Sequence, residues 1–316
     1  MAEIFIKSAS VLLAVGFCTT ILLLVRQSFP GWASDAAMSR GAGLSLLSLL
    51  VALFLSSLVM VLSKHDGAAP NLWVEAYIAA GLCEESARLL SLILLLRGMM
   101  TKDPREFIAG VTAVGLGFGV IENLSYLSGN KGDEMGHLQL GAIRGIISAP
   151  LHLACAYATG YGLWSVAHQR KPLQYAAFAF AFAIFLHGTF DMALMSLPSD
   201  AVSGPAAMAS WQKVGIGCII VATIIIATLC TLLVFNYFLQ QSRNTASHEP
   251  SADRGPSQWW QPVAACLALI AIALALMAPA ALFMNDAVKA VQYTPLFIGG
   301  AISMALWSFS IRSLFD

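Results

Sequence analysis

Long apolar runs follow one another along most of the chain, and short polar stretches separate them. A helix needs about 20 apolar residues to cross the hydrocarbon of a bilayer. The runs are too long for strands, and they lack the two-residue alternation of a membrane barrel. The pattern therefore predicts an all-α fold, a polytopic transmembrane helical bundle with eight to nine spans. The nine candidate spans are residues 8–25, 43–63, 73–97, 107–128, 138–167, 173–197, 213–239, 259–284 and 293–312.

Polar breaks divide these spans into groups. The segment QSRNTASHEPSADRGPSQ (241–258) is polar, contains proline and glycine, and has no apolar period, so we interpret it as a cytoplasmic linker. It separates a block of seven helices from a terminal pair. The predicted parts are two N-terminal helices (1–72), a four-helix core (73–197), a seventh helix (198–240), the linker and a C-terminal helix pair (259–316).

The amino-acid composition supports this fold class. The chain of 316 residues is 58% hydrophobic and 11% charged, whereas soluble domains have about 25% charged residues. We therefore expect an integral membrane protein that is surrounded by the lipid bilayer. The formal net charge is zero, so the charge balance does not point to nucleic acid as a partner.

The basic residues outside the spans are unevenly distributed between the two sides of the membrane. Ten lie in the loops after odd-numbered spans or at the C-terminus, and five lie on the other side. Because cytoplasmic loops are enriched in lysine and arginine, this bias predicts an outside N-terminus and a cytoplasmic C-terminus. Residues 1–33 contain small residues that would suit signal-peptide cleavage, but Arg26 and Arg40 follow the first span and favour its retention.

Ionisable residues inside the spans are the most informative feature of the sequence. Each one costs about 2.5–3.5 kcal/mol at the centre of a span on insertion scales. They are concentrated in spans three to six, and the other spans have almost none. We interpret this concentration as one functional centre that four consecutive helices share. Its members are Glu84, Glu85, Arg88, Glu122, Arg144, His152, His187 and Asp191.

Helical spacing groups these residues further. Arg88 lies one turn from both Glu84 and Glu85, so it can pair with either carboxylate. Asp191 lies one turn from His187 and can orient its imidazole. Glu122 and Tyr126 also lie one turn apart on a shared face. Arg144 and His152 are about two turns apart and face roughly the same way, with Arg144 as a counter-charge to the acids. Pro150 is expected to kink their helix just before His152.

Each group taken alone also fits a purely structural role. The first could be a buried ion pair that fixes helix packing, Glu122 with Asn123 could form an interhelical hydrogen-bond cluster, and His152 could be a packing residue. Glycines of the fourth span, at 110, 115, 117 and 119, are expected to allow close helix approach. It is the occurrence of all the polar groups on successive helices that favours chemistry.

Carboxylates and histidines together can activate water. One carboxylate acts as general base, and a histidine or a protonated acid donates hydrogen bonds to the oxyanion. The same residues could instead hold zinc, through Glu84 or Glu85 together with His152 and His187, with a fourth position left open. The motifs HExxH, GxSxG and GxGD are absent from the sequence, which argues against zincin-type, serine and presenilin-type proteases.

These motifs, in this order, resemble those of the PrsW family of intramembrane proteases. The family's glutamate pair and following basic residue match Glu84, Glu85 and Arg88, although lysine is common at the third position. The resemblance covers about residues 80–195. Its other elements are F-G-x-x-E-N-x-x-Y (Phe118, Gly119, Glu122, Asn123 and Tyr126), an arginine and histidine on the next helix (Arg144 and His152), and H-G-x-x-D (His187, Gly188 and Asp191).

The family is in turn similar to the CAAX-processing and bacteriocin-processing membrane proteases. By that resemblance Glu84 or Glu85 would activate water, while His187 with Asn123 or Asp191 would hold the oxyanion. Members of the PrsW family are described as cutting membrane-anchored anti-sigma factors in signalling. The resemblance thus implies a membrane-protein substrate and a bacterial inner-membrane location.

We therefore expect an intramembrane endopeptidase of glutamic or metallo type, with zinc as the cofactor in the second case. Two alternatives remain open at this point. Buried Glu, His and Arg residues also mark proton paths in transporters, although the sequence shows no inverted repeat or pair of broken helices. A catalytically inactive membrane scaffold would have the same fold.

Overall fold

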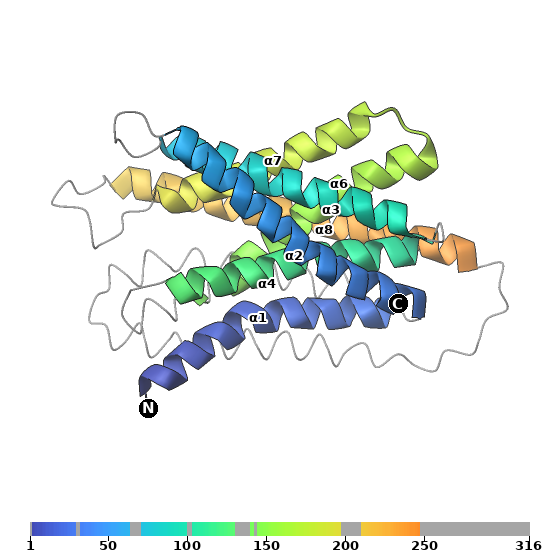
Figure 1. Ribbon diagram of the computed structural model, residues 1–316, viewed down its shortest axis with the longest axis horizontal. Helices are drawn as coiled ribbons and strands as arrows, with labels where there is room; N and C mark the ends of the chain where they lie inside the picture. The colour runs from blue at the N-terminus through green and yellow to red at the C-terminus, as the bar shows by residue number, and fades with distance from the viewer. Residues whose placement is uncertain are drawn as a thin grey trace.

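The computed structural model describes residues 2–29, 32–63, 71–99, 103–129, 140–141, 144–196 and 210–246 of the chain. Regular structure in these ranges is helical throughout (Figure 1). The elements are α1 (Ala2–Ser28), α2 (Trp32–Leu62), η1 (Val74–Leu82), α3 (Cys83–Gly98), α4 (Pro104–Gly129), η2 (Arg144–Ser148), α6 (Ala149–Gln169), α7 (Gln174–Met195) and α8 (Ser210–Ala246).

Five helices in the described part of the chain are long and apolar enough to cross a membrane. They are α1, α2, α4, α7 and α8, and they coincide with predicted spans one, two, four, six and seven. The prediction of an all-helical membrane fold is confirmed. Predicted spans eight and nine (259–284 and 293–312) lie outside the described residues, so the total of nine spans and the side of each terminus stay predictions.

In the described parts of predicted spans three and five, a π-helical segment continues into an α-helix. The segment η1 runs directly into α3, and η2 runs directly into α6. Widened π turns are rare and occur frequently at functional sites. For η2 the cause is local, because Pro150 has no N–H and its ring would clash with the carbonyl one turn earlier. The expected kink is therefore a widened turn just before His152.

Two helices extend furthest beyond the spans that hydropathy predicted. The helix α2 begins at Trp32 instead of residue 43, and α8 continues to Ala246, so that residues 241–246 of the predicted linker are helical. Both extensions consist largely of polar and small residues. Such residues tolerate a helix that projects beyond the hydrocarbon, whereas hydropathy detects only the apolar part of the helix.

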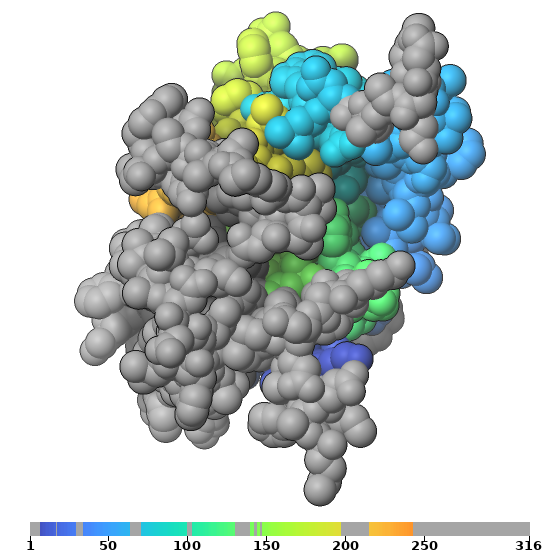
Figure 2. Space-filling model, turned by 90° about the vertical axis from the view of Figure 1, so that its left-hand side faces the viewer, coloured from blue at the N-terminus to red at the C-terminus, as the bar shows by residue number. Residues whose placement is uncertain are grey.

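The helix α4 lies inside the bundle and packs against α1, α2, α6 and α8. Along the other side, α7 packs against η1 and α2 also packs against η1, so these three elements lie next to one another. Figure 2 views the end of the bundle where α2 (blue), η1 (cyan) and α7 (yellow-green) reach the surface side by side.

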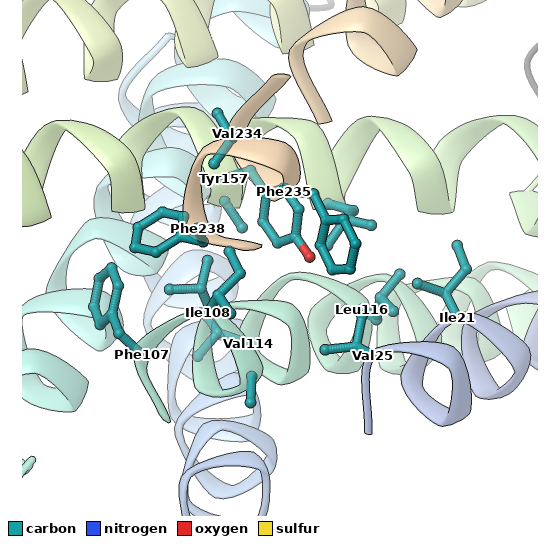
Figure 3. Packing of buried hydrophobic residues seen from close by; sticks show 14 of the residues in the cluster. Ile21, Val25, Phe107, Ile108, Val114, Leu116, Tyr157, Val234, Phe235 and Phe238 are labelled. Atoms are coloured by element: carbon teal, nitrogen blue, oxygen red, sulfur yellow. The ribbon is translucent and has the colours of Figure 1, made fainter. Parts of the chain in front are cut away.

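A large apolar cluster joins α1, α4, α6 and α8 (Figure 3). Phe107 of α4 stacks near Trp164 of α6, and Phe238 of α8 packs against both rings. Tyr157 lies within this cluster, and its hydroxyl is satisfied by a 2.8 Å hydrogen bond with Thr112. The cluster fixes the helices that carry the polar centre and is itself apolar, so it has no part in the chemistry.

The contact between α2 and α4 depends on glycines. A methyl group on Gly41 would overlap the carbonyl of Gly110 and would lie 2.9 Å from Ala113 Cβ, whereas one on Gly43 would meet nothing within 4 Å. We expect Gly41→Ala to lower the free energy of unfolding by about 1–3 kcal/mol through overpacking. Gly43→Ala is the matched control, and it should leave the free energy of unfolding unchanged or raise it by up to about 1 kcal/mol, because alanine favours a helix more than glycine does. Denaturant unfolding in detergent measures both, and equal effects would contradict this packing.

Candidate active site

Residues predicted to carry the chemistry meet in the half of the bundle where α3 begins and α4 and α7 end. Glu84 and Glu85 lie in the first turn of α3, directly after the π segment η1. Glu122 comes from α4, Arg144 from η2, His152 from α6, and His187 and Asp191 from α7. Four separate spans therefore contribute to one polar centre within an apolar bundle.

Glu85 is the locked member of the glutamate pair. Its side chain is fully buried and forms an ion pair with Arg88 one turn further along α3. The same carboxylate oxygen, Oε1, accepts a hydrogen bond of 2.7 Å from His187 Nδ1. Glu85 thus holds one arginine and one histidine, and its side chain has no exposed surface through which water could reach it.

Arg88 connects the glutamate pair to the other histidine. It is fully buried, and its Nη2 donates to His152 Nδ1 at 3.0 Å. The guanidinium also lies 4.6 Å from the centroid of the Phe118 ring, a cation–π arrangement. Because a guanidinium can only donate, His152 Nδ1 must accept, and the proton of a neutral ring is on Nε2.

Glu122 lies next to the protonated Nε2 of His152. His152 Nε2 lies 2.6 Å from Glu122 Oε2, and the other oxygen of Glu122 pairs with Arg144. Ser148 Oγ is 3.1 Å from the same histidine nitrogen. Ser148 was not among the residues predicted from the sequence, although it lies one helical turn before His152, the spacing that also separates His187 from Asp191.

Asn123 and Tyr126 surround Arg144. Asn123 is fully buried, accepts a 3.1 Å hydrogen bond from Arg144 Nε, and donates to the Arg144 carbonyl at 3.1 Å and the Ala14 carbonyl at 3.4 Å. The Arg144 guanidinium lies 3.9 Å from the centroid of the half-exposed Tyr126 ring. The amide of Asn123 is therefore fully engaged in joining α1, α4 and η2.

Glu84 is positioned differently from its neighbour. Its Oε2 is buried, lies 3.7 Å from His187 Nε2, and has no hydrogen-bond partner among the described residues. Asp191 Oδ2 approaches the same nitrogen at 3.3 Å. The Glu84 and Asp191 side chains are 15% and 14% exposed, against 0% for Glu85. These are the two carboxylates that water reaches most easily around His187.

A metal ion would find a suitable set of donors here. Glu84, His152 and His187 each offer one ligand atom, and these atoms lie within 4.8 Å of one another. Two imidazoles and a carboxylate with an open fourth position suit catalytic zinc. Glu85, which accepts from His187 Nδ1, is the kind of outer partner that orients a metal-binding histidine. A metal bound through His152 Nε2 would displace this ring from its 2.6 Å contact with Glu122.

Two glycines leave room for the rings of His152 and Tyr77. A methyl group on Gly119 would lie 3.2 Å from His152 Cδ2, which is a crowded distance, and one on Gly188 would overlap the Tyr77 ring. Tyr77 in turn shares a 3.0 Å hydrogen bond with Thr189 of α7. This contact ties η1 to the helix of His187. Sequence reasoning missed it because Tyr77 and Thr189 look like ordinary span residues.

An all-helical bundle with membrane-length helices and a buried centre of acids, histidines and arginines defines a class of membrane protein built around a polar intramembrane site. Comparison with known proteins then identifies the family. The chain belongs to the PrsW family, because the sequence model of the PrsW family intramembrane metalloproteases matches residues 30–228. The matched region contains every residue predicted for the site and omits α1.

A curated relative agrees with this assignment. Protease PrsW of Clostridioides difficile (strain 630) is 31% identical over 159 residues, which cover 49% of this chain. The aligned residues span 64% of that protein, slightly less than two thirds of its length. No solved structure matches the chain. The resemblance inferred from the motifs is confirmed at the level of the family.

Proposed function

We propose that this chain is an intramembrane endopeptidase that hydrolyses a peptide bond of a membrane-anchored protein. Membership of a family of intramembrane metalloproteases supports the reaction class. The observation that carries the proposal is Glu84, whose buried Oε2 faces His187 Nε2 without a hydrogen-bond partner among the described residues. Within the same described ranges Glu85 Oε2 is also unpartnered, and Glu122 Oε2 has only its contact with His152. Those two carboxylates, however, pair with an arginine through Oε1, whereas no described ion pair joins Glu84 to an arginine. An unsatisfied carboxylate beside an oriented imidazole is costly to stability and useful for activating water.

The four carboxylates divide into two pairs by what they contact. Glu85 and Glu122 each hold one arginine and one histidine, so we assign them to orienting His187 and His152. Glu84 and Asp191 are more accessible and have fewer partners, so we assign them to the reacting water. On this division we assign the role of base to Glu84 instead of Glu85.

In the reaction, Glu84 accepts a proton from the water whose oxygen attacks the scissile carbonyl carbon. His187, with a proton on each ring nitrogen, donates from Nε2 to the oxyanion that forms, while Glu85 at Nδ1 keeps the imidazole aimed at it. When the carbon–nitrogen bond breaks, Glu84 returns the proton to the departing amine.

The donor set also fits zinc, in line with the family's description. Zinc held by Glu84, His152 and His187 would polarise the scissile carbonyl and activate the bound water. Glu84 is then a ligand, and Asp191 is the accessible carboxylate left to accept the proton. In both versions the same residues surround the reacting water, so the site assignment does not depend on the metal.

The position of the centre among membrane-length helices favours a substrate segment that enters or borders the bilayer. The substrate class that the family resemblance suggests is a membrane-anchored regulator of the anti-sigma-factor type. A bacterial inner membrane is the location that accompanies such a substrate. Both assignments extend the proposal and are tested with it.

The proposal is tested by replacing His187 with glutamine in protein reconstituted into vesicles with candidate membrane-anchored substrates. Loss of the oriented imidazole should lower the rate of cleavage by about 10²–10⁴-fold. His168→Gln, at the far end of α6, is the control and should cleave normally. A chelator should abolish wild-type cleavage and zinc restore it if the metal version holds. Uptake driven by a pH gradient and lost in His187→Gln, without any cleavage, would replace the protease by a transporter.

A further inference from the structure

The first helix packs backbone to backbone against the segment that carries Arg144. On α1, Ser10, Ala14 and Cys18 are buried and lie one turn apart on one face. Opposite them stand Gly141 and Gly145, which have the GxxxG spacing. A methyl group on Gly145 would overlap the Leu13 carbonyl, and one on Gly141 would lie 2.8 Å from Ser10 Cα. Small residues on both sides allow this close approach within a membrane.

This contact adjoins the polar centre directly. Arg144 immediately precedes Gly145, and its side chain pairs with Glu122, which in turn holds His152 Nε2. Asn123 of α4 links the two segments, because its amide nitrogen donates both to the Ala14 carbonyl of α1 and to the Arg144 carbonyl of η2. Three elements therefore meet at one amide, and one of them is α1.

A π segment such as η2 needs support from its surroundings. Pro150 prevents a regular α-helix here, and the hydrogen bonding of the remaining π turn is less favourable, so the contacts around η2 determine where its backbone lies. The described contacts of η2 are with α1, α4 and the start of α6. The helix α4 contacts η2 at the polar centre, whereas α1 packs directly against the backbone of η2 at Gly145.

We propose that α1 is a positioning element of the active site, which acts through Arg144 to place Glu122 against His152. The residues that do this are Gly145 and Ala14 at the backbone contact, together with Asn123. The family match begins at residue 30, after the end of α1. The catalytic part of this inference rests on the proposed function, while the placement of Arg144 does not.

The placement of Arg144 can be measured without any substrate. In protein with labelled arginine, the Nε–H of Arg144 should exchange slowly with solvent because it is buried and donates to Asn123. Gly145→Ala should raise that exchange rate at least about tenfold by separating η2 from α1. The control is Gly16→Ala on α1, where a methyl group would meet nothing within 4 Å. An unchanged exchange rate in folded Gly145→Ala protein would overturn the inference.

The catalytic consequence is measured by the split between kcat and KM. Gly145→Ala should lower kcat about 10–100-fold with KM within about threefold, because a small misplacement of a catalytic group has effects of this size. A double-mutant cycle separates positioning from general destabilisation. If Gly145 acts through Arg144, adding Gly145→Ala to Arg144→Ala should cost less than about twofold more.

Full additivity of the two substitutions would show that α1 is only structural and would overturn the inference. If the wild type cleaves no substrate, the proposed function fails, and the exchange of the Arg144 Nε–H still decides whether α1 places this side chain. The two failures are therefore distinguishable. Gly16→Ala should match the wild type in kcat, KM and Arg144 exchange throughout.

Discussion

Replacing Arg88 by methionine is expected to lower the free energy of unfolding by about 3–5 kcal/mol. Methionine has a similar length and stays apolar, so the change removes charge and hydrogen bonds more than volume. It leaves the buried Glu85 carboxylate without its cation, and His152 Nδ1 without its donor. Removal of one partner of a buried pair is costly because the other charge remains away from water. Denaturant unfolding in detergent measures the change.

The control is Arg97→Met, on the exposed end of the same helix, which should have little effect. A second variant, Glu85→Leu with Arg88→Met, removes both charges and should recover a large part of the lost stability. It should not recover cleavage, because His187 has lost the carboxylate that orients it. If Arg88→Met proved as stable as the wild type, the buried pair would not be the structural support that the geometry indicates.

Much of the architecture was predictable because bilayer thickness imposes it. Apolar runs of about 20 residues have few alternatives in a membrane, so the spans that the structure describes fall where hydropathy placed them. The limits of α2 and α8 were less predictable. Their polar extensions contribute nothing to hydropathy, although they continue the helix.

The membership of the polar centre was also predictable, because an ionisable residue in a span is too costly to occur without a reason. The pairing within the centre was not. Arg88 lies within one turn of both glutamates, and local spacing allows either pair. Which glutamate pairs with Arg88 depends on His187, which also contacts Glu85. His187 is 102 positions away from Glu85 along the chain, so local spacing could not indicate this contact. Only tertiary packing shows that Glu85 is locked while Glu84 is more accessible.

Asn123 illustrates the same limit. The family resemblance made it a candidate for holding the oxyanion, and its position on α4 agrees with that idea. The structure engages its amide with the carbonyls of Ala14 and Arg144, so we propose a positioning role and leave the oxyanion to His187. The partner in α1 is 109 positions away, which no spacing rule could have indicated.

Stability and reactivity are thus divided among neighbouring carboxylates. The two that contact arginine, Glu85 and Glu122, hold the helices together, and removing either charge alone should lower the stability of the protein. Glu84 and Asp191, which water can reach, contribute little to holding the helices together. Natural active sites often retain such unsatisfied groups at the expense of stability. The adjacent residues Glu84 and Glu85 should therefore respond oppositely to neutral substitution.

Replacing Glu84 by glutamine is expected to lower cleavage by about 10²–10⁴-fold, since the amide cannot accept the proton of water. Stability should be unchanged or higher, because the change removes a buried charge whose Oε2 has no hydrogen-bond partner among the described residues. Cleavage in vesicles and denaturant unfolding in detergent measure the two effects on the same preparation. If zinc is bound, its content should fall as well, because Glu84 is one of the three candidate ligands.

The matched control is Glu75→Gln, on the preceding π segment and also half-buried, which should cleave at the wild-type rate. Glu85→Gln completes the comparison, because it should lose stability through its contacts with Arg88 and His187. Normal cleavage by Glu84→Gln would remove Glu84 from the mechanism. A large loss of stability in the same variant would show that Glu84 has a structural partner, and the division between locked and reacting carboxylates would be wrong.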